Sequence, residues 1–210
     1  FVIREVMDAA LDDMAVVVKI NMFDGVKNGV DTDEALIIAK ELEKLGVHAL
    51  VLSAGFVSKA PMEVMRGEMP IKTMAYYMNM RKFWWLKLGL RLVGKLMVPP
   101  VPYKDAYFLE TAMKFRENLK LPLIYVGGMV ALDDMEKVVN SGFVAFQMAR
   151  ALINDTEFVN KLKNGELTRS ECKHSNYCIA RMYSEDMRCH HCVEKMPNRL
   201  RNEIKKLENK

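Results

Sequence analysis

The sequence predicts an α/β protein: a partial TIM (β/α)8 barrel of about four βα units, followed by a cysteine-containing tail. Short apolar runs alternate with segments of helical periodicity, which is typical of a parallel sheet with right-handed crossovers. The runs are MAVVVKINM at 14–22, HALVLS at 48–53, LPLIYVG at 121–127 and FVAFQMA at 143–149. An open doubly wound sheet would show the same alternation, so the choice depends on the residues that end the strands.

The first run is rich in valine and is expected to form a strand buried on both faces. A helix follows, because Asp31 and Glu34 have the spacing of a capping box and Gly46 stops the segment. Its apolar stripe is expected at Ala35, Ile38 and Leu42. The run at 48–53 is a second buried strand, and further helices are expected at 105–120, 132–142 and 151–162.

The ends of the last two strands favour the barrel. Gly127 and Gly128 end one strand, and their missing side chains let backbone N–H groups approach an anion. Arg150 ends the next strand beside the start of a helix, and its guanidinium can bind phosphate oxygens through two hydrogen bonds. Barrels of this kind commonly bind phosphate at their last two strands. The alternative is a glycine turn beside a surface arginine.

Length and charge limit the domain organisation and the partners. The chain of 210 residues is 50% hydrophobic and carries a net charge of +4, with charges of both signs interspersed, so no nucleic-acid partner is expected. We expect the barrel half at 1–165, with an insertion at about 56–104, and the tail with a basic C-terminal helix at 166–210. The chain begins with Phe1 inside an amphipathic segment, so we expect it to be cut from a longer protein.

The insertion is too long for an ordinary βα loop. It contains the segment FWWLKLGLRLVGKLMV, in which Lys87, Arg91 and Lys95 recur at i, i+4 spacing. These three cations exclude a bare apolar span across a membrane. Three readings stay open: a helix lying on a membrane surface, a lid over the substrate site, and a helix packed on the protein or on a partner subunit. Gly89 and Gly94 weaken the helix, so membrane contact is the least favoured.

All four cysteines lie between Cys172 and Cys192. This clustering indicates a local metal or redox feature in a reducing, cytoplasmic compartment, because disulfide frameworks are spread through secreted domains.

Several segments resemble a known family when they are taken in order. VVVKINMFDG, LVLSAGF, LIYVGGM, GFVAFQMARALINDTEFVNKLKNG and SECKHSNYC are similar to the C-terminal half of the FMN barrel, strands five to eight, of Old Yellow Enzyme-type NADH:flavin oxidoreductases. The likeness is strongest to the branch with 2,4-dienoyl-CoA reductases and enoate reductases. It implies that NAD(P)H passes hydride to FMN, and that FMN passes it to an α,β-unsaturated carbonyl compound such as an enone or enoate.

The resemblance also implies which residues hold the flavin. Lys19 matches a basic residue beside the flavin pyrimidine ring, where a cation favours the anionic reduced form. A lysine within VVVKI is also unfavourable to bury unless it faces a negative charge. The other implied FMN contacts are Gly127, Gly128, Met129, Ala149 and Arg150. The turn at 53–55 would lie beneath the flavin.

The catalytic residues are expected in the missing N-terminal half, since no residue here is a convincing proton donor. His48, Tyr107 and Tyr125 are interpreted as structural. The outer strands would lack neighbours, so we expect this chain to pair with the N-terminal half of the barrel or with a second copy of itself.

Iron–sulfur members of the family carry three closely spaced cysteines and a fourth further on. Here Ser175 stands where the middle cysteine is expected. The thiols that remain are Cys172, Cys178, Cys189 and Cys192. Their spacing leaves open an iron–sulfur cluster, a zinc site that uses His174, His190 or His191, and reduced thiols without a metal.

Two other functions remain open at this point. One is a non-redox, phosphate-binding half-barrel of the aldolase or isomerase type, which would bind no flavin. The other is a role for the cysteine tail as a metal-binding interaction module.

Overall fold

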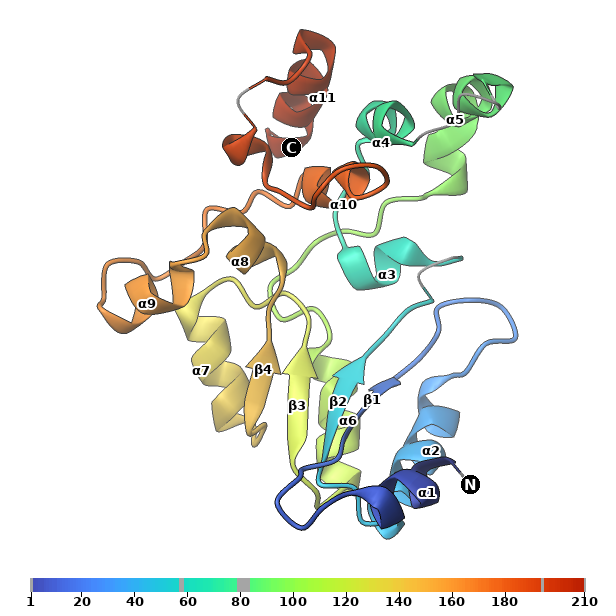
Figure 1. The fold of residues 1–210 in the computed structure, drawn as a ribbon, viewed down its shortest axis with the longest axis vertical. Helices are drawn as coiled ribbons and strands as arrows, with labels where there is room; N and C mark the ends of the chain where they lie inside the picture. The colour runs from blue at the N-terminus through green and yellow to red at the C-terminus, as the bar shows by residue number, and fades with distance from the viewer. Residues whose placement is uncertain (1, 57–58, 79–83, 194, 210) are drawn as a thin grey trace. The chain divides into compact units, whose positions relative to one another are not determined.

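The computed structural model describes residues 2–56, 59–78, 84–193 and 195–209. The chain forms two compact units (Figure 1). The sheet unit consists of Phe1–Val64 and Lys104–Met148, and the helical unit consists of Met65–Tyr103 and Ala149–Lys210. Most of the predicted insertion therefore clusters with the tail.

The sheet unit is built on four parallel strands in the order β1-β2-β3-β4. They are β1 (Val17–Asn21), β2 (Ala49–Ser53), β3 (Leu123–Val126) and β4 (Ala145–Gln147) (Figure 1). This arrangement confirms the predicted α/β class and is consistent with part of a (β/α)8 barrel. Among the described residues β1 and β4 lie at the two edges, and their pairing with further strands stays a prediction.

Helices follow the strands as predicted and pack on the sheet. Helix α2 packs on β1, α6 packs on β3 and α7 packs on β4. The bounds of the helices in this unit are α1 (Val2–Ala9), α2 (Thr32–Lys44), α3 (Pro61–Met65, whose last residue belongs to the helical unit), α6 (Leu109–Asn118) and α7 (Leu132–Asn140). Asp31 caps α2 as expected, because its Oδ1 accepts hydrogen bonds from the backbone N–H groups of Asp33 and Glu34.

The two faces of the sheet differ in polarity. The face toward the helices carries fully buried side chains, at Leu50, Leu52, Leu123 and Tyr125. The register places Lys19, Val51 and Ile124 side by side on the opposite face. Lys19 is exposed there and Ile124 is half-buried. The core therefore lies between the sheet and its helices, and the opposite face carries the candidate site.

Two expectations about this unit are wrong. Strand β1 is not buried on both faces, because it is an edge strand whose Val17 is 47% exposed. In α2, Ile38 is 44% exposed and Ala39 takes its place in the core. The buried face of α2 runs through Ala35, Ala39 and Leu42, and this i, i+4, i+7 spacing also fits a helix of 3.6 residues per turn.

The helical unit is built from helices of 3 to 14 residues. They are α4 (Ile71–Tyr77), α5 (Trp84–Met97), α8 (Arg150–Asn154), α9 (Phe158–Lys163), α10 (Tyr177–Arg181), a 3₁₀ helix (His190–Cys192) and α11 (Asn198–Glu208). The helix expected at 151–162 is two helices, α8 and α9. Asp155 separates them, since its carboxylate accepts a hydrogen bond from the N–H of Glu157 and pairs with Lys161 at 2.7 Å.

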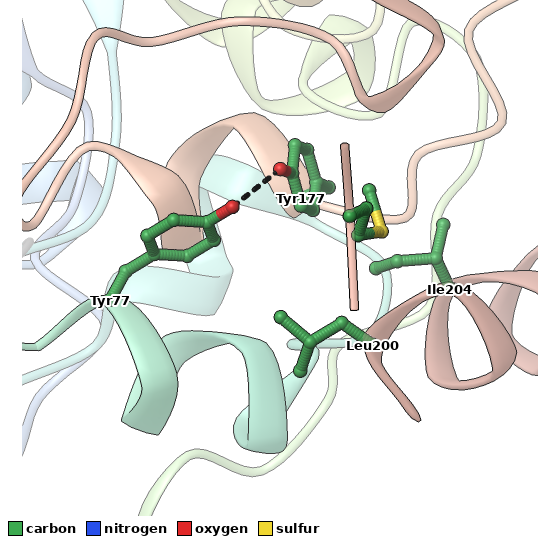
Figure 2. Packing of buried hydrophobic residues seen from close by; sticks show 5 residues of the cluster. Tyr77, Tyr177, Leu200 and Ile204 are labelled. Carbon is green, nitrogen blue, oxygen red and sulfur yellow. Dashed lines mark hydrogen bonds between the residues drawn. The ribbon is translucent and has the colours of Figure 1, made fainter. Parts of the chain in front are cut away.

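An apolar cluster joins the insertion to the tail within this unit (Figure 2). It contains Tyr77, Tyr177, Met196, Leu200 and Ile204. The hydroxyl oxygens of Tyr77 and Tyr177 are 2.7 Å apart, and Arg181 Nη1 donates to the Tyr77 hydroxyl at 3.3 Å. Both phenolic oxygens thus have partners inside an otherwise apolar contact.

Helix α5 contacts α4, which supports the packing interpretation of the insertion. At Gly94 an added Cβ would lie 2.8 Å from Ile71 Cγ2, so the glycine permits this close approach. The side chains of Lys87, Arg91 and Lys95 lie outside the described residues. Within the described part of the chain, every helix is too short or too polar to cross a membrane.

Candidate functional site

Lys19 is the cationic group of the candidate flavin site. It is the third of the five residues of β1. Its side chain is exposed on the sheet face opposite the helices, and Nζ donates to Oε1 of Gln147 at 3.4 Å. This long contact orients the ammonium group weakly and leaves it able to bind a negatively charged group.

A polar network at the C-terminal end of β1 was missed by the sequence reasoning. Asn21 Nδ2 donates to Asp24 Oδ1 and to the carbonyl oxygen of Gly55, both at 3.0 Å. Asp24 Oδ2 accepts from the Val30 N–H, and the hydrogen bonds from Asn21 and Val30 lower the pKa of Asp24. The sequence signal that could have revealed this network is the pair of polar residues, Asn21 and Asp24, at the end of an apolar run. They connect the loop after β1 to the turn at 53–55.

The glycine pair after β3 has a packing reason of its own. Gly127 and Gly128 have φ angles of 130° and 71°, which favour glycine. An added Cβ would lie 2.8 Å from Phe108 Cδ2 at Gly127 and 2.8 Å from the Ala106 nitrogen at Gly128. The segment before α6 therefore requires both glycines. Met129, which follows them, is buried. Contact of these backbone groups with a phosphate stays a prediction.

Arg150 begins α8 in the helical unit, directly after Ala149. Its Nη1 donates to Asn176 Oδ1 at 2.8 Å and to the carbonyl oxygen of Arg66 at 3.1 Å, and the guanidinium lies 5.6 Å from the centre of the Tyr103 ring. The observed contacts make Arg150 a residue that positions Asn176. Since Gly127 and Gly128 belong to the sheet unit, a shared phosphate site also stays a prediction.

Three of the four cysteines line one small cavity in the helical unit. Cys172, Cys178 and Cys189 line this cavity of about 20 Å³, whereas Cys192 is exposed and is not part of its lining. Burial raises the pKa of Cys178 to about 11 and also raises the pKa of Cys172. Without a metal, both groups are therefore protonated thiols at neutral pH.

His190 and His191, which directly follow Cys189, add two imidazoles to the cavity lining. The ligand atoms of Cys189, His190 and His191 all lie within 4.8 Å of one another. His190 Nε2 is 2.9 Å from Oε1 of Glu208 on α11. Burial, reinforced by the neighbouring His191, lowers the pKa of His190 to about 4, and burial raises the pKa of Glu208.

These residues do not fit a four-iron cluster. Such a cluster takes four thiolates around a cube. Ser175 occupies the position expected for one cysteine, Cys192 lies outside the cavity lining, and the cavity has about the volume of one small ion or water. The described residues therefore offer three thiols at this cavity and not the four that such a cluster requires.

The side chains interpreted as structural have structural contacts. His48 Nδ1 accepts from the Val16 N–H at 2.8 Å. The buried Tyr125 hydroxyl accepts from the Phe108 N–H at 3.0 Å, and the half-buried Tyr107 donates to the Val64 carbonyl at 2.6 Å. Each of these contacts holds a loop or a strand end of the sheet unit.

Comparison with known proteins finds two relatives whose names are those of redox enzymes. The chain is 35% identical over 184 residues to a 4,4'-dithiodibutanoate disulfide reductase of Rhodococcus erythropolis, covering 87% of this chain and 45% of that protein. It is 23% identical over 165 residues to an NADH oxidase of Thermoanaerobacter brockii, covering 78% of this chain and 20% of that protein. The chain thus spans less than half the length of either relative. No family model matches the chain.

Proposed function

We propose that this chain is the C-terminal half of the FMN barrel of an NAD(P)H-dependent oxidoreductase of the Old Yellow Enzyme type. The observation that carries the proposal is its 35% identity, over 87% of its length, to a protein named as a reductase. The NADH oxidase likeness supports a nicotinamide as the electron donor. Four parallel strands, each followed by a helix or helical turn, agree with strands five to eight of such a barrel.

Lys19, an exposed cation on the sheet face opposite the helices, has the charge that the flavin site requires. When bound, FMN supplies hydride transfer between the nicotinamide and the substrate. Lys19 would hold the pyrimidine end of the flavin, and its positive charge favours the anionic reduced ring. Gln147 limits the motion of the ammonium group through their 3.4 Å contact. The backbone of 127–129, with Ala149 and Arg150, would hold the phosphate.

Two substrate classes follow from different observations. The motif resemblance favours an α,β-unsaturated carbonyl compound, which would take up a hydride and a proton at its double bond. The name of the Rhodococcus relative favours an organic disulfide, which would take up two electrons and two protons and yield two thiols. Consumption of NADH or NADPH with 2-cyclohexenone and with 4,4'-dithiodibutanoate, on the same flavin-loaded protein, distinguishes the two classes.

The test of the flavin site is a matched pair of lysine variants in the protein that carries this chain. The purified protein should absorb near 450 nm after FMN is added. Lys19→Met should lower the flavin reduction potential by about 30–60 mV, because a hydrogen bond to a charged group contributes about 1.5–3 kcal/mol and 30 mV corresponds to about 1.4 kcal/mol for two electrons.

Lys44→Met is the control, since Lys44 is exposed on α2 and pairs with Glu41 on the surface. It should leave the potential unchanged. A colourless protein that ignores added FMN would contradict the proposal and favour the non-redox, phosphate-binding half-barrel. Equal potentials for both variants would remove Lys19 from the flavin site.

A further inference from the structure

Cys189, His190 and His191 present three metal-ligating groups within one short turn. Their ligand atoms all lie within 4.8 Å of one another, and the Cys189 Sγ is 3.9 Å from His190 Nδ1. In a tetrahedral zinc site the ligand atoms lie roughly 3.5 Å apart, because Zn–S and Zn–N bonds are about 2.3 and 2.0 Å long. Small side-chain rotations would therefore bring these three groups onto one ion.

We propose that these residues bind a single zinc-class divalent ion. One thiolate and two imidazoles suit zinc, cobalt and nickel ions, whereas magnesium and calcium ions require oxygen ligands. Three protein ligands leave a fourth position, which faces the cavity lined by Cys172 and Cys178. A water molecule fits that volume.

Glu208 is placed to orient His190 in this site. The ring of His190 presents Nδ1 to Cys189 and Nε2 to Glu208, whose Oε1 is 2.9 Å away. Glu208 Oε1 is buried and, among the described residues, receives no well-aligned hydrogen bond. With Nδ1 on the ion, the proton of the ring is on Nε2 and supplies that donor. Histidine ligands commonly donate their second N–H group to a carboxylate in this way.

The residues that would bind the ion are not those that would bind the flavin ring. Every residue named for the ion belongs to the helical unit, and Lys19 belongs to the sheet unit. Arg150, proposed above as a phosphate contact, lines the cavity but is not an ion ligand. Cobalt binding is read from the spectrum of the ion itself, so either proposal can fail without the other.

Cobalt(II) titration of the chelator-treated full chain is the experiment. We expect one equivalent to bind, with the visible bands of a tetrahedral ion and a near-ultraviolet thiolate charge-transfer band, and added Zn²⁺ should abolish both. Cys189→Ser should remove the charge-transfer band and weaken binding at least about 100-fold. His191→Asn should weaken binding to a similar extent, and because His191 is exposed this variant should keep the circular dichroism spectrum.

Two further variants separate ligands from neighbours. Glu208→Gln should weaken cobalt binding about 10–100-fold while the charge-transfer band is kept, since it acts through His190. Cys192→Ser is the matched control and should bind cobalt like the parent, because Cys192 is exposed and outside the cavity lining.

Three results would overturn the proposal. They are unsaturable cobalt binding, a loss of binding in Cys192→Ser equal to that in Cys189→Ser, and reconstitution with iron and sulfide to a four-iron chromophore that needs all four cysteines.

Discussion

In the sheet unit large buried side chains lie between parallel strands and the helices that follow them, whereas in the helical unit an apolar cluster is supplemented by single polar side chains that anchor the helices. Phe115 of α6 and Tyr125 of β3 are fully buried in the first unit. In the second unit, Glu203 of α11 accepts hydrogen bonds from the backbone N–H groups of Lys72 and Thr73 and from the Thr73 hydroxyl. These bonds cap the first turn of α4.

Asn176 is the second example of a polar anchor in the helical unit. It is 2% exposed and has a left-handed backbone, with φ 54°. Its Nδ2 donates to the carbonyl oxygens of Arg66 and Glu68, and its Oδ1 accepts from Arg150. The comparison teaches that loss of apolar volume should damage the sheet unit most, and loss of one amide or carboxylate should damage the helical unit most.

The largest effect is expected from Phe115→Ala in the sheet unit. Removal of a fully buried phenyl ring leaves a cavity and should lower the free energy of unfolding by about 3–5 kcal/mol. Hydrogen exchange of the β3 amides, followed by mass spectrometry, measures the loss. Val139→Ala is the control, because Val139 is 49% exposed on α7 and should cost about 0.5 kcal/mol or less. Equal effects of the two variants would show that the apolar core does not dominate this unit.

A smaller effect is expected from Asn176→Ala in the helical unit. Three hydrogen bonds of about 1 kcal/mol each are lost, so local stability should fall by about 2–3 kcal/mol. The readout is faster amide exchange in 66–68 and in α10, with the β3 amides unchanged. Asn164→Ala is the control, since Asn164 is exposed and bonds only a surface glutamate. If the amides of 66–68 and α10 exchange at the same rates in both variants, the polar contacts of Asn176 do not hold this unit together.

The smallest effect is a pH dependence that both units share. Hydrogen bonds from Asn21 and Val30 lower the pKa of Asp24 in the sheet unit, and Lys161 lowers the pKa of Asp155 in the helical unit. Below the unfolded value of about 3.9 the unfolded chain binds more protons at these sites. Their contribution is therefore complete above about pH 4 and is lost as pH falls through the lowered pKa.

Melting temperatures between pH 5 and pH 3 measure this contribution. Asp24→Asn and Asp155→Asn should each slightly reduce the slope of the melting temperature against pH. Val139→Ala, which changes an exposed side chain that does not titrate, should leave it as in the parent. If either single variant keeps the pH slope of the parent protein, the hydrogen bonds of that carboxylate do not persist in solution.

The sequence predicted the parts of this protein that depend on near neighbours along the chain. Asp31 and Gly46 bound α2 as expected, and the run at 48–53 forms the fully buried β2, because caps, glycine turns and apolar periodicity act over a few residues. It failed at Ile38 and at β1, where exposure depends on which elements lie alongside. Periodicity also missed the break at Asp155 between α8 and α9.

The candidate sites divide in the same way. The cysteine cluster and Lys19 were visible in the sequence as unusual residues in their surroundings. Only the tertiary structure excluded Cys192 from the cavity lining, placed Glu208 beside His190, and showed Arg150 bound to Asn176.

The order and type of most elements follow from the sequence, since backbone propensity and side-chain period are local properties. Which distant side chains meet depends on the tertiary structure. Glu203 caps α4 across 130 residues of chain, and Lys19 reaches Gln147 across 128. Such contacts arise because packing brings the elements together, and no spacing along the chain encodes their geometry.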